Sequence, residues 1–155
     1  KVTRTPKVLG IDGKRKMSKS LNNQIELAAT PEETRERVMQ MVTDPQRIRM
    51  SDPGDPDVCN VFSLHKIFSD AEDVEEINQA CRQAQIGCVA CKGRLAESLN
   101  QHLAPFRERR KALEEDPDYV ADVLRDGAKR AKEIASRTMG EVRKAIGFYG
   151  AEQKR

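Results

Sequence analysis

The sequence predicts an all-α protein, an irregular helical bundle preceded by a short strand and a mobile basic loop. Apolar residues recur at spacings of three and four through most of the chain after residue 30, as in helices with one buried face. Cap and breaker signals divide that portion into several helices, without an internal repeat. Charged residues make up 34% of the chain and aromatic residues 4%, which indicates a foldable protein with a thin core.

The first 30 residues predict the end of a strand and then a loop. Residues 8–11 (Val-Leu-Gly-Ile) are typical of a short strand, and Asp12-Gly13 of a turn. Residues 14–23 are polar and basic without regular periodicity, so we expect a loop there. Residues 1–20 contain seven Lys or Arg and a single Asp, although the net charge of the chain is only +3. Such a basic arm favours a polyanion partner, for example phosphate groups, and a solvated tail is the alternative.

Three helices are expected between residues 30 and 90. The run Thr30-Pro31-Glu32-Glu33 has the pattern of a capping box, which predicts a helix that ends near Val42. Residues 51–57 contain two prolines and a glycine and cannot form regular structure, and Asp57 is a plausible N-cap for the next helix. Apolar spacing then predicts a helix over residues 58–68 and another along Val74, Ile77 and Cys81.

Two further helices complete the predicted bundle. Leu95, Leu99 and Leu103 predict one, and Pro105 is expected to kink or end it. Asp116-Pro117 opens the last and clearest helix. Its predicted core face consists of Tyr119, Val120, Val123, Leu124, Ala128, Ala131, Ile134, Ala135, Thr138, Val142, Ala145 and Ile146.

The chain shows no membrane or export signal. No run approaches the roughly 18 apolar residues that span a bilayer, and no signal stretch opens the sequence. We therefore expect a cytoplasmic protein with no membrane partner. The chain begins with Lys1 rather than Met, within an extended stretch, as a fragment cut from a longer protein would.

Residues 16–20 (Lys-Met-Ser-Lys-Ser), called here the lysine-serine loop, carry two ammonium groups and two hydroxyls on a flexible stretch. Such a loop can wrap a triphosphate and stabilise the charge that develops on a leaving pyrophosphate. It differs from a P-loop, because the GxxxxGK[ST] pattern is absent. Five residues alone are a weak signal, since basic serine-containing stretches are common in tails.

The surroundings of the loop make the signal specific. Residues 9–23 (Leu-Gly-Ile-Asp-Gly-Lys-Arg-Lys-Met-Ser-Lys-Ser-Leu-Asn-Asn) resemble the second signature of class I aminoacyl-tRNA synthetases, in the form of the tryptophanyl and tyrosyl members. Residues 42–47, 52–59 and 61–68 resemble the tryptophanyl branch, and the segment Asp-Pro-Gly-Asp-Pro-Asp-Val-Cys argues against the tyrosyl one. The resemblance runs from about Thr5 to Phe148.

The resemblance implies ATP-dependent attachment of tryptophan to tRNA-Trp. It makes residues 1–30 the end of the nucleotide-binding catalytic domain with the KMSKS loop, and residues 31–155 the helical anticodon-binding domain of the C-terminal part of the enzyme. It assigns Lys16 and Lys19 to catalytic contacts with the ATP phosphates, Ser18 and Ser20 to hydrogen bonds there, and Met17 to packing. The expected ligands of the full-length enzyme are tRNA-Trp, tryptophan and ATP with Mg²⁺.

One family signature is missing from the chain. The resemblance also predicts a His-x-Gly-His motif, but the sequence contains only His65 and His102, far apart. We therefore expect the chain alone to be inactive in forming tryptophanyl-adenylate. Family members are homodimers, but we do not expect that contact in this portion, so the chain itself could be a monomer.

Cys59, Cys81, Cys88 and Cys91 are all the cysteines present and follow the spacing C-x21-C-x6-C-x2-C. Clustered cysteines in a cytosolic chain indicate a metal site more than disulfides. Structural zinc usually takes two tight C-x2-4-C pairs, of which there is one here, whereas a 4Fe–4S cluster accepts one pair and two dispersed ligands. Zinc and ordinary buried thiols are the alternatives. Some tryptophanyl-tRNA synthetases hold a 4Fe–4S cluster on a similar cysteine set, and the resemblance implies the same here.

RNA recognition should involve Lys and Arg side chains near these features. A charged helical face is more often plain solvated surface. The candidates for contacts with tRNA are Arg47, Arg49, Lys66, Arg82 and Lys92, followed by the group Arg107, Arg109, Arg110 and Lys111. Two other functions stay open from sequence: a non-catalytic RNA-binding helical module with a structural zinc site on the four cysteines, and a zinc or redox-sensing helical protein.

Overall fold

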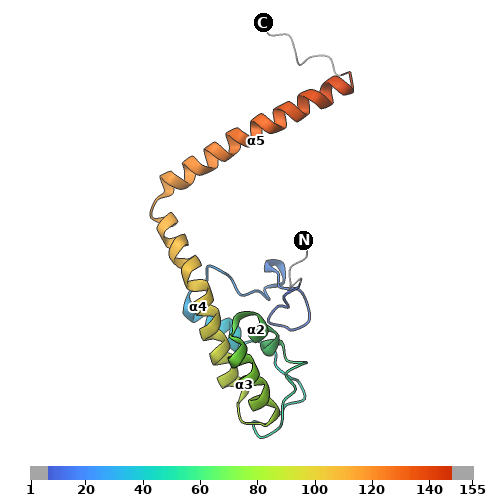
Figure 1. The fold of residues 1–155 in the computed structure, drawn as a ribbon, viewed down its shortest axis with the longest axis vertical. Coiled ribbons are helices and arrows are strands. Elements are labelled where there is room, and N and C mark those ends of the chain that lie inside the picture. The colour runs from blue at the N-terminus through green and yellow to red at the C-terminus, as the bar shows by residue number, and fades with distance from the viewer. Residues whose placement is uncertain (1–6, 148–155) are drawn as a thin grey trace. The chain divides into compact units, whose positions relative to one another are not determined.

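The structure, a computed structural model, describes residues 7–147. Those residues form a short 3₁₀ turn, η1 (Lys19–Leu21), and five α-helices (Figure 1). Contacts within the chain separate two units, one ending at Glu108 and the other beginning at Arg109. The predicted functional division at residue 30 is a different boundary and stays a prediction. Outside the described residues lie Lys1, Arg4, and the two ends of the resemblance, Thr5 and Phe148.

The helical class is confirmed, but the predicted strand at residues 8–11 is wrong. Within residues 7–147 no strand forms, and the segment makes only an isolated antiparallel bridge between Leu9 and Lys16. The Gly10 N–H donates to the Arg15 carbonyl at 2.8 Å, and Gly13 turns the chain with φ +64°. A turn this tight leaves too few residues on either side for a strand, and the other backbone bonds of the segment, from Ile11 to Asn23 and from Val42 to Ile11, are single ones.

Helix α1 (Pro31–Met39) begins as the sequence predicts. The Thr30 hydroxyl accepts from the Glu33 N–H at 3.2 Å, and the Glu33 carboxylate accepts from the Thr30 N–H at 2.8 Å. The helix ends before the predicted Val42, because the chain turns there to bury Met41, which is 2% exposed. The Val42 N–H then donates to the Ile11 carbonyl at 3.0 Å. This bond connects the segment after α1 to residues 8–25, called here the basic loop.

Helices α2 (Asn60–Phe68) and α3 (Ala71–Arg82) lie side by side (Figure 1). The prediction that Asp57 caps α2 is wrong, since the N-cap is Cys59. Asp57 instead forms ion pairs with Arg82 and Lys66, at 2.7 and 3.7 Å. The carboxylate therefore bridges α2, through Lys66, and α3, through Arg82.

Helix α4 (Cys88–Glu114) continues through Pro105, which therefore does not end it. Proline removes one helical hydrogen bond and its ring crowds the preceding turn. The helix tolerates this because its preceding turns are anchored by three buried leucines, Leu95, Leu99 and Leu103.

Helix α5 (Pro117–Ala145) opens at the predicted cap, where the Asp116 carboxylate accepts from the Tyr119 N–H at 3.0 Å. Its predicted core face is nevertheless wrong for the described part of the chain, because α5 buries no side chain there. Leu124 is 68% exposed and Ile134 is 59% exposed. The apolar stripe exists, but no described segment packs on it.

The core belongs to the unit that ends at Glu108. Residues of α1, α2 and α4 meet there, and partly buried side chains of the basic loop pack against them, as do Cys59 and Cys91. The buried cluster consists of Val38, Met41, Val61, Leu64, Leu95, Ala96 and Leu99. Among residues 7–147, no helix combines the length and the apolar character that crossing a bilayer would need.

Candidate functional site

The basic loop is built as a compact turn rather than a disordered arm. The Met17 N–H donates to the Val8 carbonyl at 3.0 Å, and the Ile11 N–H donates to the Asn23 carbonyl at 2.8 Å. The Asp12 carboxylate accepts from two successive backbone N–H groups, those of residues 14 and 15, at 3.0 and 3.1 Å. These bonds hold the pKa of Asp12 below its ordinary value, so this carboxylate stays charged inside a basic segment.

Two helices fix the loop from outside. The buried Asn60 side chain at the start of α2 donates to the Gly10 carbonyl at 2.8 Å. From α1, the Arg37 guanidinium donates to the Asn22 carbonyl at 2.6 Å and to the Gln24 carbonyl at 3.0 Å. The loop therefore has a defined backbone path relative to α1 and α2.

The side chains of the lysine-serine loop divide by exposure. Lys16 and Lys19 are exposed, while Met17 is half-buried, with its Sδ atom 3.5 Å from the Ile25 N–H nitrogen. The hydroxyl oxygens of Ser18 and Ser20 lie 2.9 Å apart. Two cations and a pair of hydroxyls thus face solvent on a fixed backbone, an arrangement that can take up a polyphosphate. The assignment of residues 16–20 to ATP stays a prediction.

The four cysteines come from three segments of the chain. Cys59 is the N-cap of α2, Cys81 lies in the last turn of α3, and Cys88 and Cys91 lie in the first turn of α4. All four are half-buried free thiols.

Arg47 links two of these sulfurs. Its Nη1 atom lies 3.7 Å from Cys81 Sγ and 4.0 Å from Cys88 Sγ, and its Nη2 donates to the Met50 carbonyl at 2.8 Å. Its Nε is buried without a hydrogen-bond partner. Gly54 makes room beside it, because a Cβ there would lie 2.6 Å from Cys81 Sγ. The Arg47 guanidinium thus packs against the Cys81 and Cys88 sulfurs, and a methyl group added at Gly54 would fill the space beside them.

Burial and repulsion between the sulfurs raise the pKa values of two of the thiols, Cys81 and Cys91. Burial, together with the charges of the other three cysteines, raises the pKa of the Cys91 thiol to about 12. Burial likewise raises the pKa of Cys81, and the charge of Arg47 opposes that shift. Geometry brings two of the four sulfurs into one region, because both Cys81 Sγ and Cys88 Sγ lie within 4.0 Å of Arg47 Nη1.

The structure decides neither metal prediction. Within residues 7–147, no group of three or more His, Cys, Asp or Glu side chains is placed to hold a metal ion, so both the 4Fe–4S cluster and the four-cysteine zinc site stay predictions. Zinc at about 2.3 Å from each sulfur needs the thiolates closer together than a cubane cluster does. Four free thiols, an adjacent guanidinium with an unpartnered Nε and the Gly54 cradle suit an anionic iron–sulfur group.

Most of the five predicted tRNA contacts are engaged within the chain. Arg47 faces the cysteines, and Lys66 and Arg82 pair with Asp57. Lys92 donates to the Met39 carbonyl at 2.8 Å, whereas the Arg49 side chain is exposed. Their role in binding tRNA stays a prediction.

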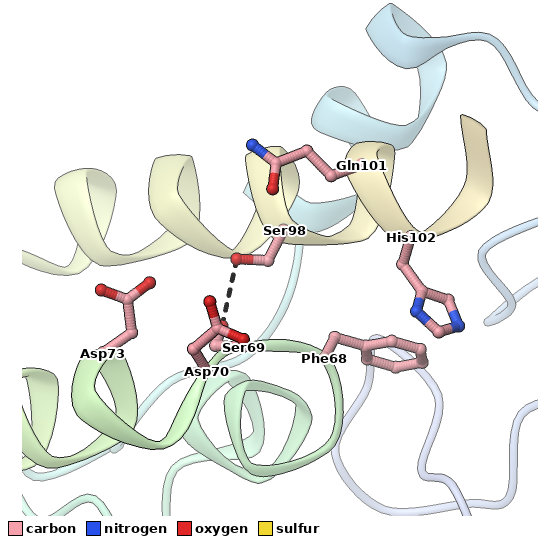
Figure 2. Close-up of a pocket in the computed structure, with 7 residues that line it drawn as sticks. All are labelled: Phe68, Ser69, Asp70, Asp73, Ser98, Gln101 and His102. Carbon is pink, nitrogen blue, oxygen red and sulfur yellow. Dashed lines mark hydrogen bonds between the residues drawn. The ribbon is translucent and has the colours of Figure 1, made fainter. Parts of the chain in front are cut away.

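A surface pocket of about 220 Å³ lies between the start of α3 and α4 (Figure 2). Phe68 and His102 meet edge to face across it, with ring centroids 5.3 Å apart. The Ser69 hydroxyl donates to Ser98 at 3.1 Å, and it also lies 2.7 Å from Nδ1 of the buried His65. The other lining residues are Asp70, Asp73 and Gln101, so none of the residues predicted for ATP, metal or tRNA lines this pocket.

Sequence reasoning missed the polar residues that build these sites. Asn23, Asp44 and Asn60 are 3%, 6% and 6% exposed, and their side chains bond to backbone 5, 11 and 50 residues away. Asparagine and aspartate in loops are usually exposed turn residues, so their burial had no local signal. The nearest sequence signal was the position of Asn60, which directly follows the predicted metal ligand Cys59.

Known proteins share both the sequence and the fold of this chain. It is 47% identical over 146 residues to the tryptophan–tRNA ligase of Aquifex aeolicus, covering 94% of this chain and 37% of that protein. It is 43% identical over 146 residues to the tryptophan–tRNA ligase of Thermotoga maritima, covering 44% of that protein. The chain therefore spans less than half the length of these relatives.

A solved structure agrees with these matches. The tryptophanyl-tRNA synthetase of Campylobacter jejuni, in complex with ADP and tryptophan, has a TM-score of 0.79 and 30% identity, over 92% of this chain and 44% of that one. The family described as tRNA synthetases class I (W and Y) matches residues 1–104. The sequence predicted the C-terminal part of a longer enzyme, and this match does not support that placement. With the loop and the helices that hold it inside the matched range, the chain belongs to the class I tRNA synthetase family for tryptophan and tyrosine.

Proposed function

We propose that this chain is part of a tryptophan–tRNA ligase, to which it contributes the lysine-serine loop, a tRNA-contacting helical region and a 4Fe–4S cluster. One observation carries the proposal: Lys16 and Lys19 are exposed on a backbone held by buried hydrogen bonds, in a chain 47% identical to a tryptophan–tRNA ligase.

In the reaction, negative charge develops on the leaving pyrophosphate, which is where this loop would act. The tryptophan carboxylate attacks the α-phosphorus of Mg²⁺-bound ATP, the bond to the leaving oxygen breaks, and pyrophosphate departs. The tRNA ribose hydroxyl then attacks the adenylate carbonyl and releases AMP. In the first step, the Lys16 and Lys19 ammonium groups would stabilise negative charge growing on pyrophosphate, and the hydroxyls of Ser18 and Ser20 would donate to phosphate oxygens.

Exchange of pyrophosphate into ATP tests the role of the loop in the complete protein that contains this chain. Lys16→Ala and Lys19→Ala should each lower kcat for tryptophan-dependent exchange by about 10²–10³-fold, with a smaller rise in KM for ATP. Lys14→Ala is the matched control, because Lys14 is an exposed lysine of the same turn outside the loop. Equal losses in all three variants would mean that only general positive charge matters, and the proposal would be wrong.

The proposed cluster is held by Cys59, Cys81, Cys88 and Cys91. When bound, it would supply iron–thiolate bonds that join the start of α2, the end of α3 and the start of α4. The raised thiol pKa of Cys91 means that metal must displace a proton there, so loading should improve as pH rises.

Metal analysis of anaerobically purified protein tests the cluster. We expect iron and acid-labile sulfide in equal amounts, with broad absorption near ~400 nm, and loss of both in each Cys→Ser variant. Ala90→Ser is the control, because it adds a hydroxyl at an exposed position between Cys88 and Cys91. Zinc without iron in that preparation, or iron that survives the Cys→Ser changes, would contradict the cluster.

The tRNA contacts are the least constrained part of the proposal. Arg49 is an exposed candidate whose side chain forms no ion pair with a described residue, whereas Arg47 faces the cysteines and Arg82 pairs with Asp57. A direct contact predicts that Arg49→Ala weakens tRNA-Trp binding and reduces its salt dependence, since each neutralised phosphate releases counterions. A homodimer of the complete protein is proposed on the resemblance alone.

A further inference from the structure

The side chain of Asn23 lies beneath the lysine-serine loop and has no part in the roles assigned above. It is only 3% exposed. Its carbonyl oxygen accepts from the Ser18 N–H at 2.7 Å, and its amide nitrogen donates to the Asp12 carboxylate at 3.1 Å and to the Lys16 carbonyl at 3.4 Å. Gly10 leaves the space for it, since a Cβ at Gly10 would overlap the Asn23 amide.

These bonds hold the backbone on both sides of Met17. The Lys16 carbonyl precedes Met17, and the Ser18 N–H follows it. Ser18 is also the residue from which η1 (Lys19–Leu21) begins. One buried side chain therefore sets the backbone from which both lysine side chains of the loop project.

Only an amide fits this position. The site asks for one acceptor, toward the Ser18 N–H, and for donors toward a carboxylate and a carbonyl. Aspartate has the same shape but no donor, and it would face the Asp12 carboxylate with a like charge. Asp12 is needed in its charged form, because it also accepts from the N–H groups of Lys14 and Arg15.

We propose that Asn23 is a positioning residue for the lysine-serine loop, whose carboxamide holds the Lys16 and Ser18 backbone so that both ammonium groups meet the polyphosphate of a nucleoside triphosphate. The inference rests on the proposed function, since that function supplies the ligand. Preorganisation of this kind lowers the barrier because the cations need not be gathered during the reaction.

The test uses Asn23→Asp in the complete protein, with two readouts. Amide exchange in residues 16–19 should accelerate about tenfold, because the two bonds that the Asn23 amide nitrogen donates to Asp12 and to the Lys16 carbonyl are lost. In pyrophosphate exchange, kcat should fall by about 10–100-fold with a smaller change in KM for ATP, as expected for misplacement of groups that act in the transition state. Asn22→Asp is the matched control, since it adds the same charge one residue earlier on an exposed side chain.

A second variant separates positioning from general damage. In Asp12→Asn/Asn23→Asp the amide and the carboxylate exchange places, so the pair across the turn can form again while the bond to the Lys16 carbonyl stays lost; part of the loss in kcat should therefore be recovered. Unchanged amide exchange in Asn23→Asp, an equal loss in Asn22→Asp, or no rescue by the double change would each overturn the proposal. If the wild type catalyses no pyrophosphate exchange, the proposed function fails, and the amide exchange still decides whether Asn23 holds the loop.

Discussion

Asp44 is a buried carboxylate, 6% exposed, that organises the segment between α1 and α2. It accepts from the Gln46 N–H at 2.8 Å and from the Asp55 N–H at 2.9 Å. The Asp55 N–H is the largest cause that holds the pKa of Asp44 below its ordinary value of 3.8, although burial works against it. The segment so closed carries Arg47 toward the cysteines.

Asp44→Asn should therefore lower the free energy of unfolding by about 1–3 kcal/mol at neutral pH, because an amide offers one acceptor where two N–H groups need one each. A carboxyl whose pKa is lower in the folded state stabilises the fold above its unfolded pKa, and this contribution is lost as pH falls through the folded value. The difference from wild type should thus be largest above pH 3.8 and shrink below it. Urea unfolding across that range measures it, and a difference that grows in acid would contradict this account.

Gly54 lies at a position where a side chain would overlap the Cys81 sulfur. A Cβ there would lie 2.6 Å from Cys81 Sγ and 3.2 Å from Arg47 Cδ, and the Gly54 N–H donates to the Cys81 carbonyl at 3.0 Å. Gly54→Ala should cost about 1–3 kcal/mol of unfolding free energy, since the sulfur must move. It should also reduce iron retention.

Gly93→Ala provides the comparison for this change. Gly93 lies within α4 and its nearest foreign atom would be 3.9 Å from an added Cβ, so alanine should stabilise the helix by about 0.5–1 kcal/mol. Chemical denaturation and iron assays on both variants check the pair. Equal iron retention in the two would show that the space at Gly54 is not required by the sulfur site.

Helices α2 and α5 reach stability by different routes. Helix α2 has nine residues, too few to be stable alone, but Val61, Phe62 and Leu64 are buried. Helix α5 has 29 residues and buries none, so it depends on its Asp116 cap, on basic residues in its last turn and on intrinsic propensity.

Glycines should therefore limit the stability of α5. An added Cβ at Gly127 or Gly140 would have no atom within 4 Å. Gly127→Ala and Gly140→Ala should each stabilise the helix by about 1 kcal/mol, and Ala128→Gly should destabilise it by a similar amount. Thermal melts followed by circular dichroism measure this. If alanine at 140 is destabilising, that side of α5 packs against something other than the described residues.

At the scale of the whole molecule, burial is concentrated in one of the two units. The buried apolar residues run from Val38 to Leu103, within the unit that ends at Glu108. The unit that begins at Arg109 includes α5 and has no buried side chain among its described residues. Stability should be distributed just as unevenly.

Hydrogen exchange of this chain should show that difference. Amides near Val61, Leu64 and Leu99 should exchange only with the opening of the whole unit, whereas those of α5 should exchange at least ~100-fold faster through local opening. A single exchange rate for both units would show that they unfold together.

Local rules in the sequence account for several elements and for the candidate residues. The capping box at Thr30 and the Asp116-Pro117 start are confirmed because a cap involves residues only three positions apart. The sequence also placed the lysine-serine loop between the turn at Gly13 and α1. Periodicity identified helices correctly but not their neighbours, as the unburied stripe of α5 shows.

Long-range contacts decided the rest. The Asn60–Gly10 bond joins residues 50 apart and the Arg47–Cys81 contact joins residues 34 apart, so neither leaves a short-range pattern. Asp57 gives a third case, because it forms an ion pair with Arg82 instead of the predicted cap on α2. A residue's chemistry and its near neighbours specify how a segment starts, turns and stops. Which buried amide holds the loop, and which guanidinium faces the sulfurs, depends on the packing of distant segments around one core.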